Sequence, residues 1–179
     1  TKEVSNFETL AELKADLEKK MQIFAEQEAK LKTRDAVLKK VVANANVDIP
    51  EVLINNRLKE MIENFKEYVQ KKGISYEDYL QHSKTDDTAL REQFRPTATE
   101  AVKTELVLSK IAEVEGIDID PKEVDQKIEE IAATQEKDAE EVKNILFKNG
   151  GINLVLEEIL FAKTVDFLVE NCKYVEASE

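Results

Sequence analysis

The sequence predicts an all-α fold, an elongated helical domain with one long helix and two helical arms, and three observations lead to this prediction. Charged residues make up 36% of the chain and hydrophobic residues 42%, with only four Gly and three Pro, a composition that favours helices. Apolar residues recur at helical spacing between capping residues, Gly and Pro. The segment "NVDIPEVLINNRL", which begins at Asn46, is echoed by "GIDIDPKEVDQKI", which begins 70 residues later at Gly116. The predicted parts are a long body helix (1–46), a first arm with its return helix (47–115), and a second arm with the C-terminal helix (116–179).

The echo extends beyond the two quoted segments and marks two related arms. In both copies a helical pattern closes, a short V/I-D-I segment crosses over, and a new helix opens at a proline. Amphipathic helices resemble one another by chance, but the matched crossover is harder to attribute to chance. The paired positions are Val37 and Val107, Leu38 and Leu108, Lys40 and Lys110, Val41 and Ile111, Val47 and Ile117, Asp48 and Asp118, Ile49 and Ile119, Ile54 and Val124, Leu58 and Ile128, and Met61 and Ile131.

The first predicted element is one long helix from Thr9 to about Ala45, a stretch without Gly or Pro. Thr9 and Glu12 have the spacing of a capping box, which satisfies backbone N–H groups at a helix start. The middle of this helix, residues 26–34, is thinly apolar, so we expect it to project from the body or to lie on it along a narrow seam. Its apolar stripe consists of Leu10, Leu13, Leu17, Met21, Phe24, Leu31, Val37, Leu38, Val41 and Val42.

The first arm begins with a helix from Pro50 to Gly73. Pro50 suits the first turn, where its missing N–H is not needed, and Gly73 suits the end of a helix. Ser75 with Asp78 forms a capping box that opens a short helix. The apolar stripe of the first helix consists of Ile54, Leu58, Met61, Ile62, Phe65, Tyr68 and Val69.

The return helix of the first arm is predicted to start at Thr85 with Thr88 and to close at Gly116. Pro96 lies inside this segment. Because proline removes a backbone hydrogen bond and clashes with the preceding turn, we expect a kink or a break there.

The second arm repeats the scheme. Asp120 is a predicted N-cap, followed by proline at the first helical position and an acid at the third. Asp138 with Glu141 caps a short helix, which the glycine pair at 150–151 ends. A last helix is predicted over residues 152–171.

Bulk properties limit the classes of function. The net charge of −12 argues against a nucleic-acid surface, because phosphate binding needs a clustered basic footprint. No run approaches the roughly 18 consecutive apolar residues that indicate a membrane span. The single cysteine, Cys172, excludes an internal disulfide framework and fits a reducing compartment, which favours a cytoplasmic location. The chain begins at Thr1 rather than Met, so we interpret it as a fragment of a longer protein.

The sequence offers no catalytic constellation, and we predict neither enzyme activity nor a cofactor or metal. His82 is the only histidine, so a triad or a multi-histidine metal site would depend on it alone. Cys172 has no second cysteine for a redox pair. Adjacent acidic pairs point in different directions on a helix, and we interpret them as solvated: Glu129–Glu130, Glu140–Glu141 and Glu157–Glu158.

The informative residues are apolar and aromatic, in one cluster around the turn at Gly73 and another around Gly150. One interpretation is that each cluster closes the small core at the end of its arm. The other is that part of each cluster stays exposed, because thin arms cannot bury every apolar side chain and exposed apolar patches mark binding sites. The candidate substrate-binding residues are Phe65, Tyr68, Val69, Tyr76, Tyr79, Leu80, Ile145, Phe147, Ile152 and Leu154.

Five segments together resemble a known family: "NFETLAELKADL", "VDIPEVLINNRLKEM", "KKGISYEDYL", "TELVLSKIAEVEGIDID" and "AKTVDFLVENCKY". In this order they are similar to the C-terminal domain of bacterial trigger factor, over essentially the whole chain. The resemblance implies an ATP-independent chaperone domain, with a body and two arms lining a cradle, that binds unfolded or nascent polypeptides. It also leaves open a weak homodimer, and the competing interpretation is a structural assembly or dimerisation module that buries the same clusters.

The resemblance further implies what the rest of such a protein would do. Full-length members have a ribosome-binding N-terminal domain and a peptidyl-prolyl isomerase (rotamase) domain, and the family is associated with protein folding, protein transport and cell division. Neither the basic ribosome-docking loop nor a β-rich isomerase segment is present in this sequence. We therefore expect ribosome contact only through the missing N-terminal domain, and no direct contact with nucleic acid or membrane.

Overall fold

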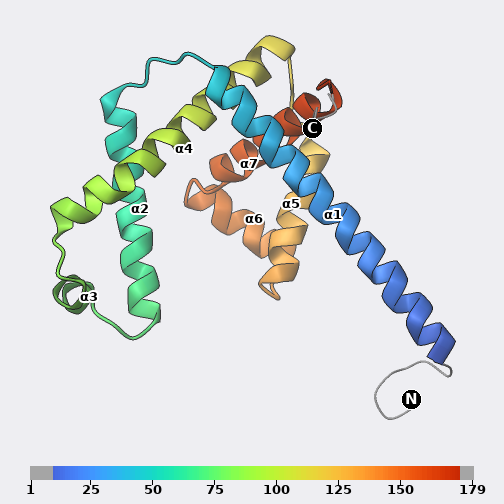
Figure 1. Ribbon diagram of the computed structural model, residues 1–179, viewed down its shortest axis with the longest axis horizontal. Helices are drawn as coiled ribbons and strands as arrows, with labels where there is room; N and C mark the ends of the chain where they lie inside the picture. The colour runs from blue at the N-terminus through green and yellow to red at the C-terminus, as the bar shows by residue number, and fades with distance from the viewer. Residues whose placement is uncertain (1–9, 174–179) are drawn as a thin grey trace, which may run out of the picture. The chain divides into compact units, whose positions relative to one another are not determined.

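The computed structural model describes residues 10–173 (Figure 1). Over that range the chain forms seven helices and no strand, which confirms the all-α prediction. The chain divides into two compact units, Thr1–Ala43 with Val165–Glu179, and Asn44–Thr164. The helices are α1 (Leu10–Asn44), α2 (Glu51–Lys71), α3 (Tyr76–Ser83), α4 (Asp87–Glu115), α5 (Pro121–Thr134), α6 (Ala139–Lys148) and α7 (Ile152–Glu170).

The first unit consists, in its described part, of α1 and the C-terminal end of α7. α1 is a single helix of 35 residues, close to the predicted bounds, and the predicted cap residue Thr9 lies outside the described residues. Arg34 of α1 forms an ion pair with Asp166 of α7. The end of the helix is buried at Val42, whereas most of its length is exposed.

The second unit contains the helices of the two predicted arms, except the C-terminal end of α7, together with the crossovers that precede α2 and α5. α4 crosses α2 and packs against it, with Ile54, Leu58 and Ala98 as their shared core. α5 and α6 enclose a second core of Ile128, Ala132 and Val142. Each arm therefore has a core of its own.

The two arms repeat the same pattern of burial, as the echo in the sequence predicts. The crossover residues Val47 and Ile49 are half-buried, as are their counterparts 70 residues on, Ile117 and Ile119. From position 51 to 62 and from 121 to 132, the buried, half-buried and exposed classes coincide at every position except 54 and 124. The repeat is thus a property of the packing as well as of the sequence.

Matched ion pairs also join the helices within each arm. Arg57 of α2 pairs with Glu60 of the same helix at 3.1 Å and with Glu105 of α4. Lys127 is the counterpart of Arg57 in α5, and it pairs with Glu130 at 3.8 Å and Glu158 of α7 at 2.6 Å. In each arm a basic residue on the first helix holds the return helix.

Several helix ends lie where the sequence predicts them, because residues close in sequence cap them. Asp120 and the residue at the third helical position form a complete capping box at the start of α5. Ser75 accepts a hydrogen bond from the N–H of Asp78, and Asp138 accepts from two N–H groups at the start of α6. Gly116 closes α4 in the left-handed conformation with φ 64°.

The predicted start of α4 at Thr85 is wrong by one residue. The N-cap is Asp86, whose side chain accepts from the N–H of Ala89 at 2.8 Å. Thr85 instead ends the preceding helix, because its N–H donates to the carbonyl of Leu80 at 3.1 Å.

Of the kink or break expected at Pro96, the break is absent, since α4 continues through this residue as one helix. The proline ring is on an exposed face, and Glu92, whose carbonyl loses its helical donor, is exposed as well. Water can therefore solvate the carbonyl that the missing N–H would have bonded. The opposite face is buried at Ala98, and this packing keeps the helix continuous.

The turn after the first helix of each arm has the same hydrogen bonds but a different residue at its left-handed position. The N–H of Ile74 donates to Val69 and that of Lys137 donates to Ala132, which is the same six-residue closure. The left-handed residue is Gly73 in the first arm, with φ 79°, and Glu136 in the second, with φ 53°. These two positions are 63 residues apart, whereas the starts of the two arms are 70 residues apart. The first helix of the second arm, α5, is therefore seven residues, or about two helical turns, shorter than α2.

Glu136→Gly is expected to raise the free energy of unfolding by about 0.5–1 kcal/mol, because glycine adopts a positive φ without a clash of its Cβ. Gly73→Ala is the reciprocal change and should lower it by about 1 kcal/mol. Urea denaturation of both variants measures the effect. A loss of stability in Glu136→Gly would show that the glutamate side chain, rather than the backbone, matters at this turn.

Candidate functional site

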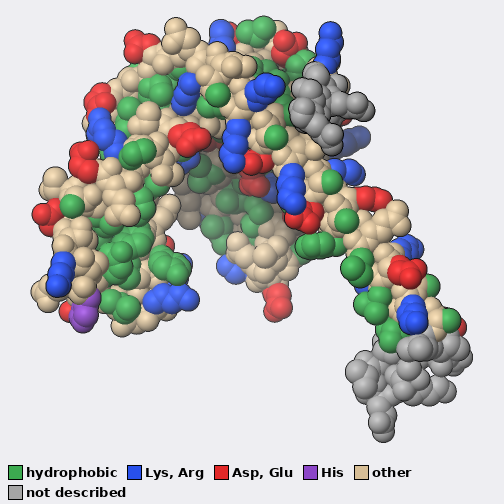
Figure 2. All heavy atoms as spheres, in the orientation of Figure 1, with side chains coloured by type: hydrophobic (Ala, Val, Ile, Leu, Met, Phe, Trp, Pro, Cys, Tyr) green, Lys and Arg blue, Asp and Glu red, His purple; other side chains and the backbone are tan. Residues whose placement is uncertain are grey.

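The first candidate surface lies where α2 turns into α3. Tyr68 is 58% exposed and Ile74, at the turn itself, is 45% exposed. Figure 2 shows hydrophobic side chains gathered over α2 and α3. We call Tyr68 and Ile74, with the half-buried aromatic residues beneath them, the first apolar patch.

A cluster of three aromatic rings supports this patch. The ring of Phe65 meets that of Tyr79 edge-on, with centroids 5.0 Å apart, and that of Phe94 at 5.6 Å. These three residues come from α2, α3 and α4, so the cluster holds the short helix against the long pair. Val69, at only 4% exposed, belongs to the core and supports the patch from below. Leu80 is half-buried, like the aromatic residues.

Tyr76 ties α3 to the start of α4. Its hydroxyl donates to Asp87 at 2.9 Å, and Arg91 donates to the same carboxylate at 2.6 Å. Burial, and then the hydrogen bond to Asp87, raise the pKa of Tyr76 from 10.0 to about 12. The hydrogen bond from Arg91 lowers the pKa of Asp87. The ammonium group of Lys66 lies 5.1 Å from the centre of the Tyr76 ring.

The raised pKa of Tyr76 predicts a late step in the ultraviolet titration of the tyrosines. Since the folded state favours the protonated phenol, the stabilisation is complete below pH 10 and is lost as the pH rises through about 12. Tyr76→Phe should remove the late step, whereas Tyr68→Phe should leave it in place. A late step that persists in Tyr76→Phe would contradict the assignment.

The second candidate surface surrounds the turn between α6 and α7. Ile145 is 40% exposed, Phe147 59% and Leu154 70%, and we call these three residues the second apolar patch. Ile152 is half-buried and packs on the core of α5 and α6. At the turn, a Cβ on Gly151 would lie 3.0 Å from the side chain of Leu146, so the close approach of the two helices favours glycine here.

The sequence did not identify the exposed apolar side chains of α1 as a surface. All of them except Ile23 belong to the apolar stripe predicted for this helix, and they are 45–70% exposed. The thinly apolar middle of this helix was the one signal in the sequence that it is not packed along its length. The exposed residues are Leu17, Met21, Ile23, Phe24 and Leu31, joined elsewhere by Val52 and Val114.

The polar residues considered in the sequence have ordinary structural surroundings. His82 is exposed on the last turn of α3, with Nδ1 2.7 Å from the carbonyl oxygen of Asp78. The thiol of Cys172 is half-buried and donates to the carbonyl of Val169 at 3.1 Å. Among residues 10–173, no three His, Cys, Asp or Glu side chains are grouped so as to hold a metal ion. No helix in that range has the length and apolar character of a membrane span.

Comparison with known proteins gives a consistent relationship over nearly the whole chain. The family described as bacterial trigger factor protein (TF) C-terminus matches residues 9–170. Trigger factor of Pelotomaculum thermopropionicum is 40% identical over 175 residues, which are 98% of this chain and 40% of that protein. Trigger factor 1 of Desulfitobacterium hafniense is 38% identical over 169 residues, which are 94% of this chain and 40% of that protein. A solved structure of trigger factor domains from Thermotoga maritima has a TM-score of 0.61 at 20% identity and covers 94% of this chain and 98% of that chain.

The helical fold and these matches define an all-α domain of the kind found at the C-terminus of trigger factors. The chain belongs to the bacterial trigger factor family, whose C-terminal part it matches. It spans 40% of the length of the two trigger factors compared above.

Proposed function

We propose that this domain holds unfolded or nascent polypeptides on its exposed apolar patches, without ATP or covalent chemistry. The observation that carries the proposal is the exposure of the two patches, at Tyr68 and Ile74 and at Ile145, Phe147 and Leu154, each beside a separate core. Isolated apolar side chains are common on protein surfaces, but clusters of them usually mark binding sites. The net charge of −12 on the chain opposes self-association.

Each patch is small, so each contact with a client should be weak. Several weak contacts on one scaffold still retain a flexible chain, because a second contact forms at high effective concentration after the first. Such contacts are also non-directional, which suits clients of many sequences. The arrangement therefore favours broad and reversible holding over tight recognition.

The domain is expected to suppress aggregation of a chemically denatured client after dilution, at stoichiometric amounts and without nucleotide. Light scattering measures the suppression, and an equal mass of an unrelated helical protein serves as the control. The same preparation should give no turnover in a prolyl isomerase assay. Unchanged client aggregation would refute the proposal, and isomerase turnover would show that the domain has a catalytic site.

A structural assembly module is the competing function, and it makes a different prediction about the native state. An exposed patch should bind an apolar fluorophore in the folded protein, whereas an assembly module would bury the same side chains in an oligomer. Dye binding together with sedimentation separates the two. A stable oligomer that binds no dye would favour the assembly module.

For the full-length protein we propose the activities that the family resemblance implies. These are action at the ribosome in protein folding and export, in the cytoplasm, with isomerase activity in a separate domain. None of the residues in this chain is assigned to those activities.

A further inference from the structure

The two arms carry corresponding short helices that differ in how firmly they are held. Ser75 caps α3 and Asp138 caps α6, and four positions after these caps lie Tyr79 and Val142. Each of the two contacts the first helix of its arm. Val142 is 4% exposed and belongs to the second core, whereas none of the eight described residues of α3 is buried. α6 is therefore anchored in a core, while α3 rests on the surface of its arm.

Two tyrosines supply polar and aromatic contacts that join α3 to α2 and α4. The hydroxyl of Tyr76 donates to Asp87 at the start of α4 at 2.9 Å, and Lys66 of α2 lies 5.1 Å from its ring centre. The ring of Tyr79 meets Phe65 of α2 edge-on, with centroids 5.0 Å apart. Each of these contacts is weak beside the burial of a core side chain. A helix of eight residues is also too short to stay folded without such contacts.

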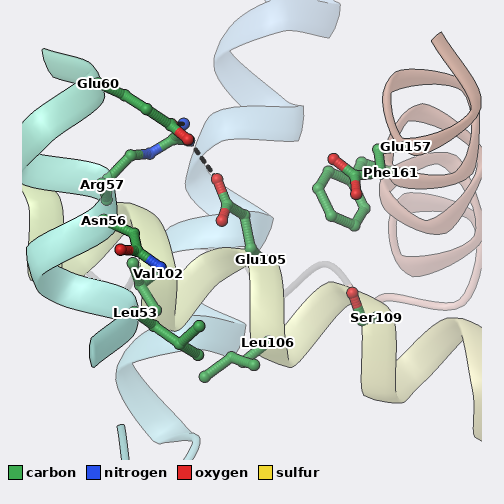
Figure 3. A pocket seen from close by; sticks show the side chains of 10 residues that line it. All are labelled: Leu53, Asn56, Arg57, Glu60, Val102, Glu105, Leu106, Ser109, Glu157 and Phe161. Atoms are coloured by element: carbon green, nitrogen blue, oxygen red, sulfur yellow. Dashed lines mark hydrogen bonds and ion pairs between the residues drawn. The ribbon is translucent and has the colours of Figure 1, made fainter. Parts of the chain in front are cut away.

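Opening of α3 would uncover aromatic side chains without removing their support. Phe65 contacts Tyr79 on α3 and also Phe94 on α4, with centroids 5.6 Å apart in the second pair. Phe94 packs on the core that α2 and α4 share. The ion pair of Arg57 with Glu105 joins the same two helices (Figure 3). The surface under α3 should therefore keep its shape when α3 leaves.

The segments on both sides of α3 contain a residue in the left-handed conformation. Gly73 precedes the helix with φ 79°, and Lys84 follows it as the C-cap with φ 53°. Glycine adopts many backbone conformations at little cost, whereas lysine in this conformation is strained by its Cβ. Opening of α3 would use the freedom of the first position and release the strain of the second. These two positions can serve as its hinges.

We infer that α3 is a lid over Phe65 and Phe94, which opens locally while α6 stays docked. Phe65 lies one turn before Tyr68 on α2, so its uncovered ring would continue the first apolar patch. This step rests on the proposed function, because it gives the open lid a larger surface for clients. A client that binds the open form would shift the equilibrium toward that form.

Hydrogen exchange of the free domain, read by mass spectrometry, tests the lid without any client. After correction for intrinsic rates, peptides from α3 should exchange about tenfold faster than peptides from α6, because α3 opens without breaking a core. Tyr76→Phe removes the hydrogen bond to Asp87 and should speed the exchange of α3 by a further three- to tenfold or so, with α6 unchanged. Equal exchange of α3 and α6 would overturn the inference, as would an unchanged α3 in Tyr76→Phe.

Tyr68→Phe is the matched control for exchange, because it removes a phenol hydroxyl from an exposed position on α2. The exchange of α3 and α6 should stay as in the unmodified domain. An acceleration of α3 equal to that in Tyr76→Phe would show a general effect of tyrosine replacement and would overturn the inference.

Reduced and carboxymethylated lysozyme, which stays unfolded, is the client probe. Its addition should speed the exchange of α3 by about two- to fivefold, because it holds the lid open. Tyr76→Phe should bind it about twofold more tightly in fluorescence anisotropy, since a larger fraction of the domain is open. Slower exchange of α3 with the client, or weaker binding by Tyr76→Phe, would show that clients hold the closed form and would overturn the inference. If the probe does not bind the unmodified domain, the proposed function fails, and exchange of the free domain still decides whether α3 is a lid.

Discussion

Ile62→Ala is expected to lower the free energy of unfolding by about 2–5 kcal/mol, because it removes the largest part of a fully buried side chain and leaves a cavity. Ile62 is 0% exposed and lies on α2, between the core residue Leu58 and the aromatic cluster at Phe65. Urea denaturation followed by far-ultraviolet circular dichroism measures the loss. The effect should be among the largest of any single substitution in the first arm.

Val52→Ala on the same helix is the matched control. Val52 is 61% exposed, so its truncation should change the free energy of unfolding by less than about 0.5 kcal/mol. The two substitutions remove similar apolar groups and differ mainly in burial. A loss of less than about 1 kcal/mol in Ile62→Ala would mean that α2 does not contribute a close-packed core.

The helix ends could be predicted from the sequence because capping is local chemistry. Ser75, Asp120 and Asp138 act on N–H groups two or three residues away, so spacing alone indicates their roles. The start of α4 shows where this approach fails. Thr85 and Asp86 are both residue types that cap helices, so spacing alone does not choose between them. In the structure Asp86 caps α4, and the N–H of Thr85 donates to the carbonyl of Leu80.

Burial was harder to predict, because it depends on which elements meet. The apolar stripe of α2 was predicted and contains the core residues Ile54, Leu58 and Ile62. The stripe of α1 has the same periodicity, yet Met21 and Phe24 are 70% and 68% exposed. Periodicity identifies the apolar face of a helix but not whether another helix covers it.

The candidate site was predicted as two clusters, and the structure separates their members by exposure. Tyr68, Phe147 and Leu154 are exposed, whereas Val69 is in the core and Phe65 holds three helices together. Consecutive residues of a helix point about 100° apart, and which of these directions is covered depends on the neighbouring helices. The sequence could therefore locate each cluster but not divide it.

Loss of both apolar patches is expected to weaken client binding far more than loss of either one. The first variant carries Tyr68→Ser with Ile74→Ser, and the second carries Phe147→Ser with Leu154→Ser. Each should reduce affinity for an unfolded client by about two- to threefold, since the client still contacts the remaining patch. The combined variant should lose more than about tenfold, because no patch is left to retain a client released by the other.

The four residues are 45–70% exposed, so the substitutions should leave folding intact. Client affinity and thermal melting are measured on the same preparations, with Val114→Ser as a control that removes an exposed apolar side chain outside both patches. If the melting temperature collapses while the remaining folded protein binds normally, the four residues stabilise the arms and are not contacts. If Val114→Ser weakens binding as much as either paired variant, clients respond to total apolar surface. The result that supports two discrete sites is a large combined loss with an unchanged melting temperature and an inert control.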